Sequence, residues 1–393
     1  MTIPDTLLGR FRGEFPITDS RAYLFGGGLA PAARRVSEAV ASWMRTWSLD
    51  PLEAWDHLAT ETDAARERLG RILGADPATI AIVDGASRAS NIAVGLLDAP
   101  SGSNVVVDAT TYPSSLYPWL VREQAGVEVR RAPSGRAGLA ADIGDLERLI
   151  DDRTVAVSIT HVHPHTGFRH ELRPIADLAH AHEAVLIVDV SQSAGVVPLD
   201  VSADGVDLAA GTAVKWLLGP PGIGFLYESP ELLARTGAPQ VGYMGAALDP
   251  SDRTRLRIRP DARRHELGLP SLLGMPGWRA GMEIVLEAGV PAILRHVEGL
   301  VEHCLGGLDA LGLVATTPRD RADRAGLVSI PAQRPLELRA FLREHGVDVW
   351  GFERGSLIRA DPALFNNEQD IDRLLGGLAA YVAEKGRTAI QAR

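Results

Sequence analysis

Short apolar runs alternate with stretches of helical periodicity through the first two thirds of the chain. The apolar runs predict strands at residues 79–84, 103–108, 153–160, 184–190 and 222–228. Apolar residues with helical spacing predict helices between them, at 86–97, 114–125, 142–150 and 171–183. Strands and helices that alternate in this way favour an α/β fold whose mostly parallel sheet has helices on both faces.

The pattern changes near residue 276, where long helices begin. These are predicted at 276–289 and 291–312, followed by strands at 326–331, near 347–351 and 356–360, and by helices at 335–345 and 367–384. We therefore expect a large domain at 51–275 and a linking helix with a small C-terminal α/β domain at 276–393. The N-terminal segment, 1–50, is expected to pack with the small domain.

Composition and charge narrow the class of protein. The chain has 393 residues, of which 46% are hydrophobic and 23% charged, as is usual for a globular enzyme. A net charge of -10 argues against nucleic acid or an anionic membrane as the main partner. A single cysteine, Cys304, excludes an intramolecular disulfide. Since neither a signal peptide nor a membrane-spanning run is visible, we expect a cytoplasmic protein.

Lys215 is the one charged residue in an otherwise apolar stretch, residues 211–222. Because burial of an unpaired ammonium is costly, such a lysine extends to solvent, is neutral with a lowered pKa, or is covalently occupied. Upstream, Asp189 ends the apolar strand predicted at 184–190. A lysine that forms a Schiff base and an acid that keeps a pyridinium nitrogen protonated are what a pyridoxal phosphate enzyme requires. The pair therefore predicts that cofactor.

The other candidate residues follow strand ends, where ligands bind in parallel sheets. Gly85 turns the chain after a strand and a helix begins, so free N–H groups there, with the Ser87 hydroxyl and Thr212, can hold a phosphate. Tyr112 can lie on the pyridine ring, and Gln192 can donate to the ring oxygen. Each feature also has a purely structural interpretation. Gly85 and Ser87 can belong to an ordinary capped helix, Tyr112 can be a half-buried loop residue, and Gln192 can be a polar residue of a turn.

Arg359 ends a short apolar strand of the small domain, and its guanidinium geometry suits the carboxylate of an amino acid substrate. The alternative interpretation is an arginine paired with Asp361. A histidine cluster, His161, His163, His165 and His170, raises the possibility of a metal site. Pro164 interrupts that strand and no acidic ligand follows closely, so we expect no metal. We expect His161 to support the wall of the site and His163 to face the substrate.

Residues 160–172, residues 187–215 and residues 357–371 together resemble the fold type I pyridoxal phosphate enzymes of the aminotransferase class V group. Within it, the chain is most similar to kynureninase, cysteine desulfurase and isopenicillin N epimerase-like proteins. The resemblance implies a mostly parallel seven-stranded sheet in the large domain, and a homodimer with sites at the interface. It also implies a role for each candidate residue: Lys215 as Schiff-base lysine and general base, Asp189 as ring-nitrogen partner, Tyr112 as stacking ring with His161 beside the cofactor, Ala86, Ser87 and Thr212 as phosphate ligands, Gln192 as ring-oxygen donor, and Arg359 as carboxylate ligand.

Three departures from the group's pattern bear on the reaction. Cys304 lies inside an amphipathic helix, which excludes a standard cysteine desulfurase with a thiol on a mobile loop. The stretch 268–271 lacks the threonine that lends a phosphate contact to the neighbouring subunit. Glycines stand at 26–28, where kynureninase carries polar side chains. We expect Gly27 and Gly28 to leave space and backbone donors for a substrate that is bulkier than, or different from, kynurenine.

The expected function is β-elimination or related Cα/Cβ chemistry on a cysteine conjugate or another modified amino acid in natural-product biosynthesis. Alternatives within the group are a kynureninase-like hydrolase, an aminotransferase and a decarboxylating deaminase. Two hypotheses from other classes of protein stay open. One is a protein that binds pyridoxal phosphate without turnover, and the other is a metal hydrolase built on the histidine cluster.

Overall fold

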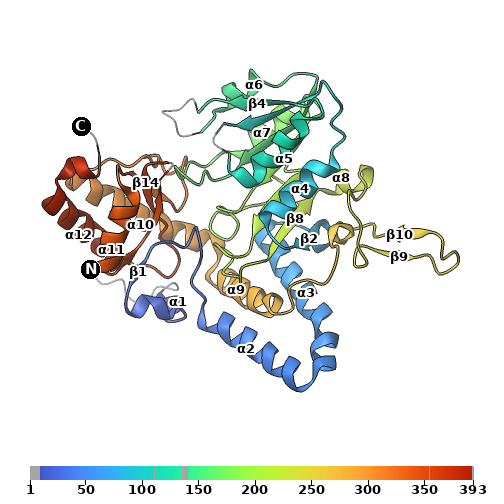
Figure 1. Cartoon of the computed structure of the whole chain (residues 1–393), viewed down its shortest axis with the longest axis horizontal. Helices are drawn as coiled ribbons and strands as arrows, with labels where there is room; N and C mark the ends of the chain where they lie inside the picture. Colours follow the sequence, from blue (N-terminus) through green and yellow to red (C-terminus); the bar gives the residue numbers. More distant parts are fainter. Residues whose placement is uncertain (1–8, 110, 135–139, 354, 392–393) are drawn as a thin grey trace.

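The computed structural model describes residues 9–109, 111–134, 140–353 and 355–391. Figure 1 shows a large domain, coloured cyan to yellow, beside a smaller lobe coloured orange to red. Residues 1–8 of the segment expected to pack with the small domain lie outside the described residues. Among the described helices, none is long and apolar enough to cross a membrane.

The large domain is built on the expected seven-stranded sheet. Its strands are β2 (Ile80–Val83), β3 (Asn104–Asp108), β4 (Glu128–Ala132), β5 (Thr154–Thr160), β6 (Val185–Asp189), β7 (Leu208–Thr212) and β8 (Gly224–Glu228). They are arranged in the order β2-β8-β7-β6-β5-β3-β4. β8 pairs antiparallel with both of its neighbours, β2 and β7, and the other four neighbouring pairs are parallel. The prediction of a mostly parallel sheet is therefore confirmed.

The apolar runs did not predict β4 and β7. The sequence of β4 is Glu-Val-Arg-Arg-Ala, and most of it is polar because it is an edge strand with one open side. The sequence of β7 is Leu-Ala-Ala-Gly-Thr, and its small residues have weak strand preference. Its position between β6 and β8 makes it a strand, since both neighbours hydrogen-bond to it.

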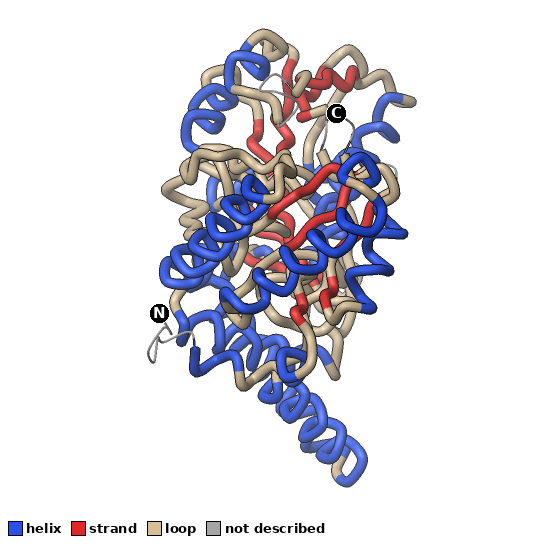
Figure 2. Tube along the Cα trace, turned by 90° about the vertical axis from the view of Figure 1, so that its left-hand side faces the viewer, coloured by secondary structure: helices blue, strands red, loops and turns tan. Residues whose placement is uncertain are grey.

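Helices cover both faces of the sheet (Figure 2). They include α4 (Ala86–Leu96), α5 (Pro113–Glu123), α6 (Ile143–Glu147), α7 (Leu172–His180) and α8 (Pro230–Arg235). Successive residues of β3 alternate between two cores: Val105 and Val107 pack in the core that contains Trp119 of α5, and Val106 packs in the other. Two buried faces explain why the central strands are apolar throughout.

The N-terminal segment contacts both lobes. After α1 (Gly9–Arg12) and η1 (Pro16–Asp19), strand β1 (Ala22–Tyr23) pairs with β12 (Val347–Asp348) of the smaller lobe. Helices α2 (Arg34–Leu49) and α3 (Pro51–Leu73), which the periodicity did not predict, pack on α9 (Gly274–Ala288) instead. The short helix η2 (Pro77–Thr79) then leads into β2. The division into domains at 50 and 275 stays a prediction.

The smaller lobe combines a sheet with flanking helices. Its elements are α10 (Val290–Ala310), β11 (Val328–Pro331), α11 (Pro335–Glu344), β13 (Trp350–Phe352), β14 (Leu357–Ala360), α12 (Glu368–Lys385) and η4 (Arg387–Ala389). The sheet has the order β11-β14-β13. The strand predicted near 347–351 is divided between β12 and β13, which belong to different sheets.

The segment between the lobes contains an arm and a buried helix. Strands β9 (Ala246–Leu248) and β10 (Leu256–Ile258) form a hairpin that projects from the body (Figure 1). Helix η3 (Ala262–His265) follows and lies against β2 and β8.

Where η3 meets β8, the fully buried Glu228 carboxylate accepts hydrogen bonds from Thr236 (2.6 Å), Arg264 (2.7 Å) and His265 (2.8 Å). Burial raises the pKa of Glu228, but these partners outweigh burial and hold it below its ordinary value.

Candidate active site

Lys215 lies in a tight loop between β7 and β8. Backbone hydrogen bonds close the loop: the Leu218 N–H donates to the Lys215 carbonyl (3.1 Å), and the Gly219 N–H donates to the Ala213 carbonyl (2.9 Å). Leu218 has a φ of 55°, a left-handed conformation that costs a leucine about 1–3 kcal/mol. Its side chain is buried in the core, which holds the backbone in this conformation. The packing therefore holds the lysine at a fixed point beyond the end of β7.

The Lys215 amine faces a cavity of about 450 Å³ at the carboxyl edge of the sheet. Burial lowers the pKa of this amine to about 8, and the charges of Asp189 and Asp361 oppose the fall. Its Nζ lies 5.7 Å from the centroid of the Tyr112 ring. The chain holds one other lysine, Lys385, which lies exposed at the end of α12 beside Glu384. Lys215 is thus the lysine that can act as a base or nucleophile in this cavity.

Asp189 ends β6 and lines the same cavity. Its Oδ1 accepts the Ser191 N–H (2.8 Å), and its Oδ2 accepts the Ser115 hydroxyl (3.1 Å). Both bonds hold the carboxylate in one orientation. Ser115 was missed from the sequence; the signal was its place in the first turn of α5, three residues after Tyr112.

The start of α4 also lines the cavity and presents hydrogen-bond donors to it. Helix α4 begins at Ala86, and its N-cap, Gly85, provides no side-chain cap, so the first N–H groups have no partner from that residue. Ser87 contacts the Ser114 hydroxyl (2.9 Å), and the Thr212 hydroxyl donates weakly to the Ile223 carbonyl (3.3 Å). The cavity is lined by Gly85, Ala86, Ser87, Ser114 and Thr212. Free N–H groups and hydroxyls at a helix N-terminus form an anion site.

A buried hydroxyl without a partner supports this interpretation. Ser191 Oγ lines the cavity and has no hydrogen-bond partner among the residues that the structure describes. Buried polar groups are normally paired, so this one marks a place where a bound group supplies the missing bond. Together with Lys215, Asp189 and the start of α4, it gives a set of donors, an acid and an amine that fits pyridoxal 5′-phosphate.

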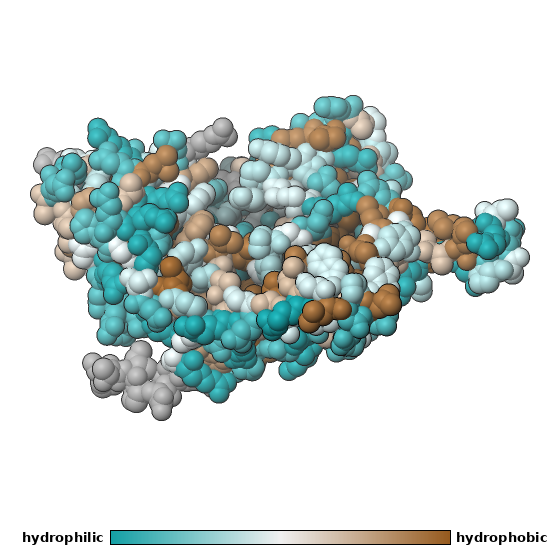
Figure 3. All heavy atoms as spheres, turned by 60° about the horizontal axis from the view of Figure 1, so that its bottom comes forward, coloured by the Kyte–Doolittle hydropathy of each residue, from teal (hydrophilic) through white to brown (hydrophobic). Residues whose placement is uncertain are grey.

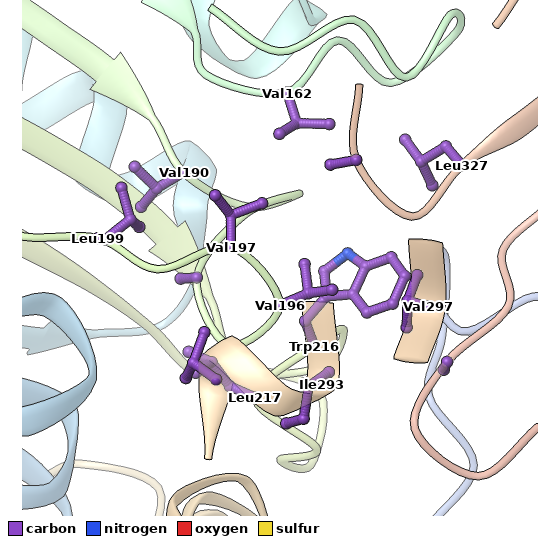
Figure 4. Close-up of a cluster of buried hydrophobic side chains, with 14 of the residues drawn as sticks. Val162, Val190, Val196, Val197, Leu199, Trp216, Leu217, Ile293, Val297 and Leu327 are labelled. Atoms are coloured by element: carbon purple, nitrogen blue, oxygen red, sulfur yellow. The ribbon is translucent and has the colours of Figure 1, made fainter. Parts of the chain in front are cut away.

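Gln192 lines the cavity but is already hydrogen-bonded on both ends of its amide. Its Nε2 donates to the Gly27 carbonyl (2.8 Å), and its Oε1 accepts the indole N–H of Trp216 (2.9 Å). One amide hydrogen therefore remains for the predicted ring oxygen. Figure 4 shows the Trp216 ring among Val196, Val297 and other buried side chains. Trp216 was missed from the sequence, and it ties the lysine loop both to Gln192 and to the core.

The histidines lie behind the cavity wall. The backbone N–H of His161 donates to the backbone carbonyl of Asp189 (3.0 Å). Burial lowers the pKa of the His161 imidazole to about 3. His163 is buried, with its Nδ1 3.0 Å from the Thr166 hydroxyl, and is absent from the cavity lining. That it faces the substrate stays a prediction, which this geometry does not favour. His165 stacks on Phe352, with ring centroids 4.9 Å apart. Among the described residues, no group of three or more metal-ligating side chains is present.

The glycines at 26–28 do not leave the expected space. A Cβ at Gly27 would lie 2.8 Å from Asp361 Oδ2, and one at Gly28 would lie 2.0 Å from the Phe25 ring. These positions therefore need glycine because the protein's own atoms approach so closely. Room for a bulky substrate and substrate contact through the backbone of Gly27 and Gly28 both stay predictions, and these close approaches do not favour the first.

Arg359 is buried and does not line the cavity. Its Nε and Nη2 donate to the two oxygens of Asp361, at 2.6 and 2.8 Å. This is the ion pair with Asp361 that the sequence left open as an alternative. The pair lies inside the protein and not on its surface. Contact with a substrate carboxylate stays a prediction that this geometry does not favour.

Comparison with known proteins agrees with the geometry. The family model for Aminotransferase class-V matches residues 22–374. An uncharacterized aminotransferase, YcbU, of Bacillus subtilis is 26% identical, covering 96% of this chain and 98% of its own. A kynureninase of Deinococcus radiodurans is 29% identical, covering 96% and 94% respectively. A mutant of the cystine C-S lyase C-DES, solved with glycine covalently linked to its PLP cofactor, superposes with a TM-score of 0.86 at 24% identity; the match covers 94% of this chain and 98% of the C-DES chain.

The fold, the cavity and the match along nearly the whole chain converge on one conclusion. Lys215, Asp189 and the start of α4 occupy one cavity at the carboxyl edge of the sheet. The likeness to C-DES extends to the whole architecture. The chain therefore belongs to the aminotransferase class V family of pyridoxal 5′-phosphate-dependent enzymes.

Proposed function

We propose that the enzyme catalyses β-elimination, or related chemistry at Cα and Cβ, on a cysteine S-conjugate or another modified amino acid of natural-product metabolism. The observation that carries this proposal is the contrast between its amine and its thiol. Lys215 faces the cavity with a lowered pKa, whereas Cys304 is fully buried in α10 and burial raises its pKa to about 12. A base is available in the site, but no thiolate of this chain can accept sulfur from a substrate.

The chain's own residues divide the work. Lys215 is placed to remove the proton from the substrate's Cα and to return a proton later. Asp189 would pair with the ring nitrogen of the cofactor, the start of α4 would hold its phosphate, and Tyr112 would cover one ring face. Pyridoxal 5′-phosphate, when bound, supplies the electron sink for the charge released at Cα. The Ser115 and Ser191 contacts keep the Asp189 carboxylate in position.

Product analysis tests this reaction. With water, an S-substituted cysteine should give a thiol, pyruvate and ammonia in equal amounts. Thiol is measured with a chromogenic disulfide, pyruvate by reduction with lactate dehydrogenase, and ammonia enzymatically. Thiol release without pyruvate, or turnover that requires an α-keto acid acceptor, would contradict elimination and indicate substitution or transamination.

A kynureninase-like hydrolysis is the second candidate, favoured by the Deinococcus radiodurans relative. The same preparation should be offered kynurenine, with anthranilate followed by fluorescence. Efficient anthranilate formation without pyruvate from any cysteine conjugate would replace the elimination proposal with this one.

We also propose that the enzyme acts as a homodimer with its sites near the interface. Large apolar side chains are exposed at the α2–α3 corner, including Leu49 (87%), Leu52 (75%) and Trp55 (55%). Trp55 shares a hollow with Tyr243 and Leu269, and Leu269 lines a cavity that includes Asp84 of the active site. Hydrophobic side chains also cover the base of the β9–β10 arm (Figure 3). Exposed apolar side chains gathered on one part of the surface favour association.

The mass of the enzyme in solution tests the dimer. We expect twice the 42.0 kDa chain mass by light scattering. Combining Leu52→Asp with Trp55→Asp should shift the protein to monomer, because the partner would bury two carboxylates in an apolar contact. Val314→Asp is the matched control, since Val314 is equally exposed (60%) but lies after α10 in the smaller lobe. A wild-type monomer at micromolar concentration would rule out the dimer.

A further inference from the structure

Arg88 is a cation placed where a helix disfavours one. It lies in the first turn of α4, and that turn contains no acidic residue. The N–H groups at the start of a helix carry partial positive charge, so they repel an arginine unless an anion lies beside both. Arg88 also lines the cavity that Lys215 and Asp189 line. Its position becomes favourable when an anion occupies this part of the cavity.

The described part of the chain does not supply that anion. Arg88 donates through Nη2 to the amide oxygen of Gln240 (2.6 Å), and its guanidinium forms an ion pair with no carboxylate among the described residues. Arg173, in the first turn of α7, differs in this respect because Asp177 pairs with it at 2.9 Å. An amide orients a guanidinium but does not cancel its charge. Arg88 is thus held in place, half-buried, with its charge unbalanced.

The same part of the cavity carries the other donors of the anion site. A side chain in the first turn leans back toward the N-terminus of its helix, which brings the Arg88 guanidinium to the side of the N–H groups at the start of α4. Ser87 and Thr212 line this region as well. A Cβ built on Gly85 would meet no atom within 4 Å, so the backbone at the helix start faces open space. Helix N–H groups, hydroxyls and a guanidinium fork together match the oxygens of a phosphate dianion.

We propose that Arg88 is a further ligand of the cofactor's phosphate group and that Gln240 is the residue that positions it. The Gln240 amide occupies one N–H of the guanidinium, and the others can still donate to phosphate oxygens. The inference goes beyond the proposed reaction, since the cofactor is anchored in the same way whichever reaction follows. It also gives a role to the segment between α8 and the β9–β10 arm, because Gln240 lies there.

Two forms of the cofactor, with and without phosphate, separate this role from a general effect on the cavity. Apoprotein is titrated with pyridoxal 5′-phosphate and, separately, with pyridoxal, and binding is followed by the quenching of tryptophan fluorescence. Arg88→Gln should raise the dissociation constant of pyridoxal 5′-phosphate by about tenfold to a hundredfold, because it removes charge-assisted hydrogen bonds. The dissociation constant of pyridoxal should not change. Arg88→Lys keeps the charge but loses the planar fork, so its affinity should fall between those of the wild type and Arg88→Gln.

Two further variants distinguish binding from positioning. Gln240→Ala should weaken the binding of pyridoxal 5′-phosphate less than Arg88→Gln does, and it should add nothing in the double variant, because Gln240 acts through Arg88. Arg173→Gln is the matched control: it removes the same charge from the first turn of α7, but Arg173 does not line the cavity. This control should bind both cofactor forms as the wild type does.

Phosphorus NMR of the holoenzyme reports on the phosphate directly. A guanidinium beside the phosphate favours its dianion, so it holds the pKa of the phosphate below its ordinary value. The phosphorus signal of Arg88→Gln should therefore titrate at a higher pH than that of the wild type. A residue that only supports the cavity wall would leave this titration unchanged.

The apoprotein should not lose stability in the same variant. Because the Arg88 cation opposes the helix dipole, Arg88→Gln should unfold at a Tm no lower than that of the wild type. Circular dichroism of the apoproteins measures Tm and shows whether the variant folds. A lower Tm together with an equal loss of affinity for both cofactor forms would assign Arg88 a structural role.

These outcomes are separate from those of the proposed reaction. If Arg88→Gln binds pyridoxal 5′-phosphate as tightly as the wild type, Arg88 is not a phosphate ligand. Weaker binding of L-alanine to the Arg88→Gln holoenzyme, with unchanged cofactor affinity, would place the arginine with the substrate instead and also overturn the proposal. None of these results bears on the release of thiol and pyruvate, which tests the elimination chemistry by itself.

Discussion

Lys215→Ala is expected to lose the visible absorption band that borohydride bleaches in the wild type, and its turnover should fall by at least about 10³-fold. The alanine removes both the amine that binds the cofactor and the base that moves the Cα proton. The loop itself should be unaffected, because backbone hydrogen bonds and the buried Trp216 and Leu218 hold it. The loss should therefore appear in absorbance and turnover, with little change in the circular dichroism spectrum.

The composition of the chain makes this experiment unusually direct. Lys385 is the only other lysine, so Lys385→Ala is a complete control. It should keep the band and the turnover, since its ammonium is exposed at the end of α12. After borohydride reduction of the wild type, mass spectrometry should find the cofactor on the peptide that contains Lys215. Cofactor on the Lys385 peptide, or near-normal turnover by Lys215→Ala, would remove Lys215 from the mechanism.

Glu228→Ala is expected to lower the free energy of unfolding by about 3–5 kcal/mol. Glu228 has no exposed surface, and its removal would leave the nearly buried Arg264 guanidinium without a counter-ion. The Thr236 hydroxyl and the His265 ring would lose their acceptor at the same time. Because β8 pairs with both β2 and β7, the loosened strand also lies next to the lysine loop.

Urea unfolding of the cofactor-free protein, followed by tryptophan fluorescence, measures this effect without a contribution from ligand binding. Asp309→Ala removes the carboxylate of an exposed arginine pair and should cost about 0–1 kcal/mol. A Glu228→Ala variant no less stable than Asp309→Ala would show that the buried network is replaced by other contacts or by water.

Local patterns predicted much of the fold because each central strand is buried on both faces. An apolar run such as Val185–Asp189 is visible without any knowledge of its neighbours. β4 and β7 escaped notice for the opposite reason: edge exposure and small residues hide a strand whose existence depends on its partners. Helices α2 and α3 were missed as well, although Asp50 caps α3 through the Glu53 N–H.

The sequence by itself determined the cofactor class, because an amine in an apolar stretch and an acid at the end of a buried strand have few other uses. It also placed Asp189 and the helix start at Ala86 at one sheet edge, since parallel strands share that edge. Lys215 follows β7, a strand that the apolar runs did not predict, so the structure was needed to place it there. Only the tertiary structure decided the partners: Ser115 for Asp189, Trp216 for Gln192, and Asp361 with Gly27 beside Arg359. Spacing along the chain records burial and periodicity, whereas hydrogen-bond partners and charge balance depend on which distant segments meet. Gly27 and Asp361 are far apart in sequence, and only the fold brings that glycine against that carboxylate.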